Sequence, residues 1–432
     1  MVSQDGSVDV DGREGAAGAC ADANGGSCGH RRPRTSEEAA HSQSAPDSAR
    51  LVAFLVHDVA YFLSHRLPVA QEAQKRGYRV VVLGEGAAAS PDLAAYGMDG
   101  REIAFRRGGV NLRGELRSLR SIRHQLRACN PDLVHAVALK GALYGGLLTR
   151  FSAAASVLAP TGLGYVFTDD GWRARTLRRV LIPLLCVAFR GRRRIALFQN
   201  RDDTAIFTGM GAVRSERVAV VQGAGVDLEA FKPSPEPPSP PTVVVMPARL
   251  VRHKGVEEFV EAAQRLKHLG LPVRLRIAGD SDPENPTAVD PAWIARIQEA
   301  GDVELMGRQS DMAAVYRGCH IVCLPSYREG LPKALLEASA CGRPMVATDV
   351  PGCRDVVAEG ETGYLVPLGD IAGLVNALRT LAEDSHLRAR FGAAARTRAE
   401  RLFSKDSIAV QTVNLYDDLL AESIRAEKGP VT

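Results

Sequence analysis

Two carboxylates and a glycine stand close together in the second half of the chain. Glu329 and Glu337 are separated by seven residues, and Gly330 directly follows the first of them. Glu329 lies just ahead of an expected helix and Glu337 about a turn and a half inside it, so the two cannot stack on one helix face as an acid and base pair. Their placement favours acceptance of hydrogen bonds from separate hydroxyl groups of a sugar.

The elements around this pair predict a binding site for a diphosphate. Apolar, β-branched runs cover His320–Ser326 and Pro344–Thr348, as expected for buried strands of a parallel sheet. Between them, Pro332 suits the first helical position and Gly342 the left-handed position after the end, which predicts a helix over Pro332–Cys341. The free amides and the positive dipole end at this helix start attract a diphosphate.

Two cations follow another predicted strand, in the segment VVVMPARLVRHKG. Arg249 and Lys254 are expected near the same sheet edge as Glu329. Cations that stabilise the charge building up on a departing diphosphate would lower the barrier of such a reaction directly. The alternative is that both are solvated surface charges.

The segment REGLPKALLEASACGRPMVA, residues 328–347, resembles the donor signature of retaining glycosyltransferase family 4, which has the GT-B fold. The resemblance implies that Glu329 contacts the transferred sugar and that Glu337 binds the ribose hydroxyls of the nucleotide. It further implies that the amides at Gly330 and Leu331 hold the phosphates.

The same resemblance assigns two more segments. Arg249 and Lys254 look like the phosphate clamp of the family. The segment VELMGRQSD is expected to frame the nucleotide base through backbone groups. Its candidate residues are Met306, Gly307 and Arg308.

Pairs of aspartates with one residue between them occur at Asp9 and Asp11 and at Asp280 and Asp282. Metal-dependent glycosyltransferases of the other major fold use this spacing. Here the first pair lies in a predicted tail, and the second lies in a domain whose cationic clamp makes a divalent ion redundant. We therefore expect no essential metal and no cofactor, with the nucleotide sugar acting as a substrate.

Two loops in the first half resemble the acceptor side of polysaccharide-building family members. HDVAYFLSHRLPVA contains His65 and Arg66, and TGLGYVF contains Gly162 and Gly164. Both segments follow predicted strands, and glycine allows a backbone to approach a ligand closely. A tight turn is the alternative explanation for the glycines.

A histidine and a lysine complete the candidates in the first half. His135 ends the predicted strand DLVHAV at its carboxyl edge, where a family histidine commonly touches the donor sugar, and Lys140 follows in the next loop. A contact with the donor or acceptor and a structural role both remain open for each residue.

The bulk composition is that of an ordinary globular protein. Of the 432 residues, 45% are hydrophobic and 24% charged, and the net charge of +4 is too small to indicate nucleic acid binding. Residues 1–48 have almost no large apolar side chains and are predicted to form a disordered tail. Because the sequence shows neither a secretory signal core nor the roughly 20 apolar residues that cross a bilayer, a cytoplasmic location is expected.

Strand-like and helix-like segments alternate along the chain, which predicts an α/β protein with two Rossmann-like parallel-sheet domains facing across a cleft. This is the GT-B arrangement. Proline-rich residues in the tract Lys232–Pro241 favour an extended connector between the domains. The predicted divisions are an acceptor domain over residues 49–228, a linker over 229–241, a nucleotide-sugar domain over 242–405, and a C-terminal helix over 406–432 that braces the first domain.

Arginines bracket an apolar stretch at Thr176–Arg194 that is too short to span a bilayer. The segment Arg173–Arg194 is predicted to lie on an anionic membrane surface, since each basic residue there gains roughly 1 kcal/mol. Its arginines would also suit the diphosphate of a polyprenyl-linked acceptor. A core helix with a basic rim is the alternative.

The eight cysteines show no paired framework, as expected for reduced thiols in a large intracellular protein. Cys319, His320 and Cys323 form the tightest cluster. A zinc site would need a second pair of ligands, whereas these residues enter a predicted buried strand, so core positions are favoured over a metal site.

Together these patterns predict a retaining hexosyl- or N-acetylhexosaminyltransferase that uses a UDP-sugar and acts on a lipid-linked saccharide in the assembly of surface polysaccharide or glycan. It would lie at the cytoplasmic face of the membrane. One alternative is a nucleotide-sugar 2-epimerase of the same fold, which needs acid and base groups at the sugar carbon. Another is a non-catalytic protein that binds sugar nucleotides.

Overall fold

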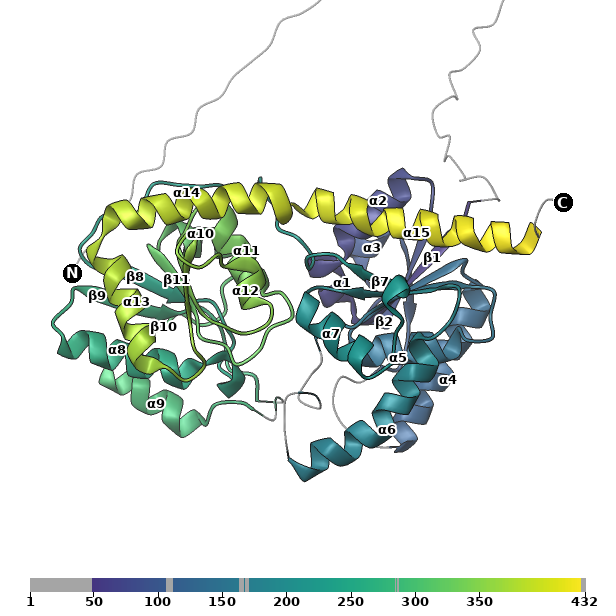
Figure 1. The fold of residues 1–432 in the computed structure, drawn as a ribbon, viewed down its shortest axis with the longest axis horizontal. Helices are drawn as coiled ribbons and strands as arrows, with labels where there is room; N and C mark the ends of the chain where they lie inside the picture. The colour runs from purple at the N-terminus through teal and green to yellow at the C-terminus, as the bar shows by residue number, and fades with distance from the viewer. Residues whose placement is uncertain are drawn as a thin grey trace, which may run out of the picture. The chain divides into compact units, whose positions relative to one another are not determined.

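A computed structural model describes residues 49–105, 112–162, 167, 171–283, 285 and 287–428 of the chain. Two parallel sheets with helices on their faces form two Rossmann-like lobes, shown in Figure 1. The predicted fold class is thereby confirmed. The predicted tail over residues 1–48 lies outside the described residues.

The first lobe is built on a seven-stranded sheet with the order β3-β2-β1-β4-β5-β6-β7. Its central strands read as continuous apolar runs because helices cover both faces of the sheet. The strands are β1 (Leu51–Asp58), β2 (Arg79–Glu85), β3 (Asp99–Glu102), β4 (Leu133–Val137), β5 (Ala155–Ala159), β6 (Arg194–Phe198) and β7 (Val218–Val220). The helices are α1 (Val59–His65), α2 (Leu67–Lys75), α3 (Pro91–Ala95), α4 (Leu112–Cys129), α5 (Leu139–Leu148), α6 (Trp172–Phe189) and α7 (Arg201–Gly209), followed by the 3-10 turn η2 (Ser215–Arg217).

The second lobe is built on a six-stranded sheet with the order β10-β9-β8-β11-β12-β13. Its strands are β8 (Thr242–Met246), β9 (Val273–Ile277), β10 (Glu304–Leu305), β11 (Ile321–Leu324), β12 (Met345–Thr348) and β13 (Gly363–Val366). Its helices are the 3-10 turn η3 (Arg252–Lys254), α8 (Val256–His268), α9 (Pro291–Ala300), α10 (Met312–Arg317), α11 (Lys333–Ala340), α12 (Cys353–Val356), α13 (Ile371–Glu383) and α14 (Ser385–Leu402).

The last helix, α15 (Lys405–Lys428), packs on the first lobe beside α2 (Figure 1). Ile408, Val413 and Tyr416 on one side of α15 join the apolar core between that helix and the first sheet. At its edge, Asp417 accepts a hydrogen bond of 2.8 Å from Arg76. The chain therefore returns to the first lobe after completing the second.

The proline-rich tract before β8 is fixed to the second lobe by two buried arginines. Arg388 of α14 donates to both carboxylate oxygens of Glu236, at 2.9 to 3.2 Å. Arg343 donates to the hydroxyl of Ser234 at 2.8 Å and to the carbonyl of Pro235 at 3.1 Å. Because the backbone of this tract is held by specific donors, it is a packed strap and not a free tether.

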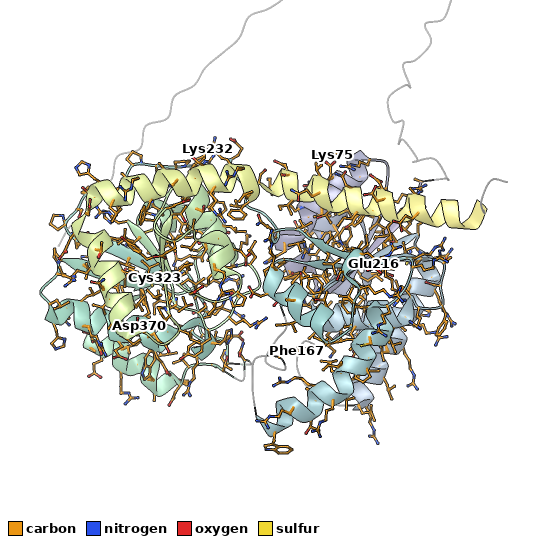
Figure 2. The ribbon with its side chains drawn as sticks, viewed as in Figure 1. Lys75, Phe167, Glu216, Lys232, Cys323 and Asp370 are labelled. Atoms are coloured by element: carbon orange, nitrogen blue, oxygen red, sulfur yellow. The ribbon has the colours of Figure 1, made fainter. Side chains whose placement is uncertain are left out.

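The cluster of cysteines and histidine belongs to the core of the second lobe, where Figure 2 shows Cys323. Cys319, His320 and Cys323 are fully buried. The His320 ring accepts from the amide of Val243 at 2.9 Å through Nδ1 and, through Nε2, lies 3.0 Å from the carbonyl of Pro237. The histidine thus holds the strap against β8, which is a structural role.

Candidate active site

A cavity of about 410 Å³ opens where strands of both sheets end. Its walls come from segments that follow β1, β5, β6, β8 and β11, which is the edge where open α/β sheets bind ligands. The size is that of an ordinary small-molecule site. Its lining includes Tyr61, His65, Thr161, Gln199, Arg249, Lys254, Glu329, Gly330, Leu331, Pro332 and Lys333.

The floor of the cavity is the start of α11. Lys333 and Ala334, the first residues of this helix, line the cavity, and no side chain caps the helix start. Its first amides and the positive dipole end are therefore available to an anion. Pro332 takes the N-cap position with extended backbone, at φ −72° and ψ 113°, so the prediction that it is the first helical residue was wrong by one position.

Lys254 and Glu329 form an ion pair within this cavity. The Lys254 Nζ atom lies 2.6 Å from Glu329 Oε1, and the side chains are 20% and 10% exposed. The lysine is placed by the turn at Gly255, where an added Cβ would lie 2.0 Å from the carbonyl oxygen of Pro325. Only glycine fits there, so the turn fixes the cation beside the carboxylate.

Arg249 lies at the more exposed rim of the cavity and pairs with Asp282. This carboxylate belongs to the pair of aspartates considered above as a metal motif. Within the described part of the chain, no group of three or more His, Cys, Asp or Glu side chains is arranged to hold a metal ion. Asp282 thus orients a cation toward the cavity.

Gly330, just before α11, lies against backbone and side-chain atoms of the first lobe. A Cβ added there would meet the carbonyl oxygen of Thr161 at 2.7 Å and the Oε1 atom of Gln199 at 2.9 Å. The Asn200 side chain donates to the carbonyl of Gly330 at 2.8 Å. The glycine is required by this close approach, and its amide stays at the cavity wall beside Leu331.

Glu337 lies behind the cavity wall. It is buried on α11, accepts a hydrogen bond of 3.0 Å from the Tyr316 hydroxyl, and lies 3.5 Å from the Lys333 ammonium. Burial raises the pKa of this carboxyl, and the Lys333 charge and the Tyr316 hydrogen bond oppose the rise. Glu337 is absent from the cavity lining, so its expected contact with ribose stays a prediction.

The three residues assigned to the nucleotide base follow β10. The Met306 amide donates to the carbonyl of Ile277 at 2.9 Å, and Gly307 bridges to Gly279 with φ +66°. Met306, Gly307 and Arg308 are absent from the cavity lining, so a role in base binding stays a prediction.

The first lobe brings one of its predicted residues into the cavity. His65 lines it, whereas Arg66 starts α2 and is 2% exposed. Gly162 follows the lining residue Thr161 and has φ +153°, which favours glycine. Gly164 lies outside the described residues.

His135 and Lys140 were misplaced by the sequence. His135 lies in the middle of β4, fully buried, stacked on Phe54 and hydrogen-bonded through Nδ1 to the hydroxyl of Tyr416 on α15. Burial lowers the pKa of its imidazole well below the usual range. Lys140 belongs to α5, not to a loop, and lies 2.8 Å from Glu115 of α4. Neither residue lines the cavity.

Several lining residues were not named by the sequence prediction, among them three with polar side chains. Tyr61 follows β1, Gln199 follows β6, and Lys333 opens α11. Tyr61 lies in the quoted segment HDVAYFLSHRLPVA, Lys333 lies in the quoted donor segment, and Gln199 directly follows β6, so position after a strand was the available signal.

Comparison with known proteins agrees with this geometry. Residues 227–398 match the family model of glycosyl transferases group 1, and residues 52–198 match the model of glycosyl transferase 4-like domains. The N,N'-diacetylbacillosaminyl-diphospho-undecaprenol alpha-1,3-N-acetylgalactosaminyltransferase of Campylobacter jejuni is 26% identical over 387 residues, which are 85% of this chain and 99% of that protein.

Solved structures share the fold at low sequence identity. Sucrose-phosphate synthase from Thermosynechococcus elongatus has a TM-score of 0.72 at 20% identity, over 86% of this chain and 100% of that one. Anabaena HepE in complex with UDP and glucose has a TM-score of 0.68 at 19% identity, over 85% of this chain and 100% of that one.

The fold and the matched domains together define a glycosyltransferase of the GT-B class. More narrowly, its first lobe matches the glycosyl transferase 4-like domain and its second lobe matches the domain of glycosyl transferases group 1. Among the described residues, no helix is long and apolar enough to cross a membrane.

Proposed function

We propose that this glycosyltransferase moves a sugar from a UDP-sugar to a lipid-linked saccharide, with retention of the anomeric configuration and without a metal ion. The uncapped start of α11, flanked by the ion pair of Lys254 and Glu329, is the observation that carries the proposal. The name of the Campylobacter relative, which describes a sugar transferase acting on a diphospho-undecaprenol substrate, supports the class of acceptor.

In the proposed reaction the donor diphosphate lies at the start of α11, with Lys254, Lys333 and Arg249 around it. The bond between the anomeric carbon and the diphosphate oxygen breaks, and the acceptor hydroxyl forms a new bond on the same face. The hydroxyl proton goes to the departing diphosphate oxygen. Because Glu329 is held by Lys254, it serves to bind the sugar and not to attack it.

A donor panel tests this function. Purified protein is mixed with radiolabelled UDP-sugars and a polyprenyl-diphosphate saccharide, with and without a chelator, and the products are separated. We expect labelled glycolipid with one α-linkage, at a rate that the chelator changes less than about twofold. Release of an epimer would establish the epimerase alternative, and absence of any product would leave a binding protein. A metal requirement would contradict the metal-free mechanism.

The surface of α6 supports a membrane partner. Trp172, Val180, Leu184 and Val187 are exposed apolar side chains, and their spacing places them on one face of the helix. Exposed arginines lie on this helix at Arg175 and Arg179 and just after its end at Arg190 and Arg192. An apolar helical face among guanidinium groups fits an anionic membrane surface, where both burial and charge favour binding.

The double substitution Val180→Ser and Leu184→Ser is expected to weaken binding to vesicles containing anionic lipid about tenfold, because less apolar area enters the interface. Sedimentation with phosphatidylglycerol vesicles measures the effect. The matched control is Leu269→Ser, which removes an exposed leucine from the second lobe and leaves binding unchanged. Equal binding by the double variant and the wild type would refute the membrane role of α6.

A further inference from the structure

The wall that the first lobe supplies to the cavity contains a stacked pair of rings. The rings of Tyr61 and His65 lie 4.4 Å apart at their centroids, with an angle of 10° between their planes. Both residues belong to α1, and both line the cavity opposite the start of α11. The stack fixes the orientation of the imidazole, so the direction of its nitrogen atoms is a feature of the site.

Hydrogen bonds around Ser64 determine the tautomer of His65. The Ser64 hydroxyl oxygen is 2.7 Å from His65 Nδ1, 2.9 Å from the carbonyl of Ala60 and 3.1 Å from that of Tyr61. A hydroxyl has one proton, and carbonyl oxygens only accept, so the proton of Ser64 is used on the carbonyl side. Nδ1 therefore donates to the serine, and Nε2 carries the free electron pair.

The surroundings keep this ring neutral. Burial, together with the charges of Lys333 and Arg66, lowers the pKa of His65 to about 4. Lys333 lies close, with its ammonium 3.4 Å from the Ser64 carbonyl. With Nδ1 bonded to Ser64, Nε2 is the acceptor atom of a neutral ring in a cavity that Arg249, Lys254 and Lys333 also line.

A neutral acceptor nitrogen favours ligand groups that can donate a hydrogen bond. It gains nothing from a phosphate oxygen, which also only accepts, whereas a sugar hydroxyl donates to it. The cations and the helix start are on the second lobe, where the proposed diphosphate binds, and His65 faces them from the first lobe. The hydroxyl that it meets should therefore belong to the other substrate.

We propose that His65 accepts, at Nε2, a hydrogen bond from a non-reacting hydroxyl of the acceptor saccharide and thereby orients the saccharide for attack. This inference rests on the proposed function. The reacting hydroxyl still gives its proton to the departing diphosphate, so His65 needs no change of protonation during transfer. It is a residue that determines acceptor specificity and position.

Two substitutions distinguish the contribution of the Nε2 atom from that of the stacked aromatic ring. His65→Phe keeps an aromatic ring on Tyr61 and removes Nε2, and we expect kcat/KM for the acceptor to fall about 10- to 100-fold. Hydrolysis of the UDP-sugar by water, measured without acceptor, and the Kd for UDP are expected to change less than about threefold, because the donor contacts remain. His65→Gln places a carbonyl oxygen near the position of Nε2 and should recover acceptor kcat/KM to within about fivefold of wild type.

Other results for these two variants would overturn the inference about His65. If His65→Phe lowers hydrolysis and transfer equally, or weakens UDP binding, the histidine serves the donor. If His65→Phe keeps the wild-type kcat/KM for the acceptor, the ring matters and Nε2 does not. If His65→Gln is as poor as His65→Phe while both melt at the wild-type temperature, an acceptor atom at this position does not support transfer and the proposed hydrogen bond is refuted. Wild-type protein that makes no glycolipid from any UDP-sugar would instead refute the proposed function itself. His268→Phe, on the outer surface of α8, controls for loss of an exposed histidine and should match wild type.

Discussion

Replacing Lys254 with methionine is expected to lower turnover about 10²- to 10³-fold while the protein stays folded. The lysine lies 2.6 Å from Glu329 and next to the start of α11, where the departing diphosphate gathers negative charge. A preorganised donor aimed at such charge contributes about this factor in a water-poor site. Methionine preserves much of the side-chain volume, so the change isolates the ammonium group. Initial rates at saturating UDP-sugar and acceptor measure the loss.

The matched control is Arg252→Met, which removes a cation from the same 3-10 turn. Arg252 is mostly exposed, lies 3.5 Å from Glu257, and does not line the cavity. We expect its turnover to stay within about twofold of wild type, since an exposed ion pair contributes little. Glu329→Gln should lower kcat/KM for the donor without abolishing the lysine effect. A Lys254→Met enzyme with more than a third of wild-type turnover would remove the lysine from the mechanism.

The fold was largely predictable because its signals are local. The helix predicted over Pro332–Cys341 is observed as α11 (Lys333–Ala340), and the apolar runs at His320–Ser326 and Pro344–Thr348 contain β11 and β12. Alternation of buried strands with helices leaves few arrangements other than two parallel sheets. Gly342 likewise takes the left-handed backbone expected after a helix, with φ +67°.

The candidate site was predictable where its residues share one short segment. Glu329, Gly330 and Leu331 all line the cavity, because the strand, the turn and the helix start position them together. Arg249 and Lys254 join them from β8, the strand that pairs with β11. Neighbouring parallel strands end at one edge, so position after a strand suffices to place such residues.

Contacts between distant segments were not predictable. His135 looks like a strand-end residue in the sequence, yet it faces α15, and its partner Tyr416 is 281 residues away. The residues of the segment DLVHAV do not indicate which face of the sheet α15 covers.

The substitution Glu236→Gln is expected to lower the free energy of unfolding of the second lobe by about 3 kcal/mol. The Arg388 guanidinium is 3% exposed and donates to both oxygens of this carboxylate, at 2.9 to 3.2 Å. Removing the negative partner of a buried pair leaves an uncompensated charge in a region from which it cannot reach water. The arginine keeps its bonds to the carbonyls of Leu381 and Ala382, so the change isolates the pair.

Urea titration can follow the second lobe alone, since the chain has two tryptophans and they belong to different lobes. In a Trp172→Phe background, the fluorescence of Trp293 on α9 reports this lobe, and the slope of the transition shows whether the surface exposed on unfolding is unchanged. Glu229→Gln is the control in the same linker, because Glu229 is exposed and pairs only with Lys232 at the surface, so no measurable shift is expected. A Glu236→Gln transition that coincides with the control would show that the strap is held by its backbone contacts, to Arg343 and His320, and not by the buried charge pair.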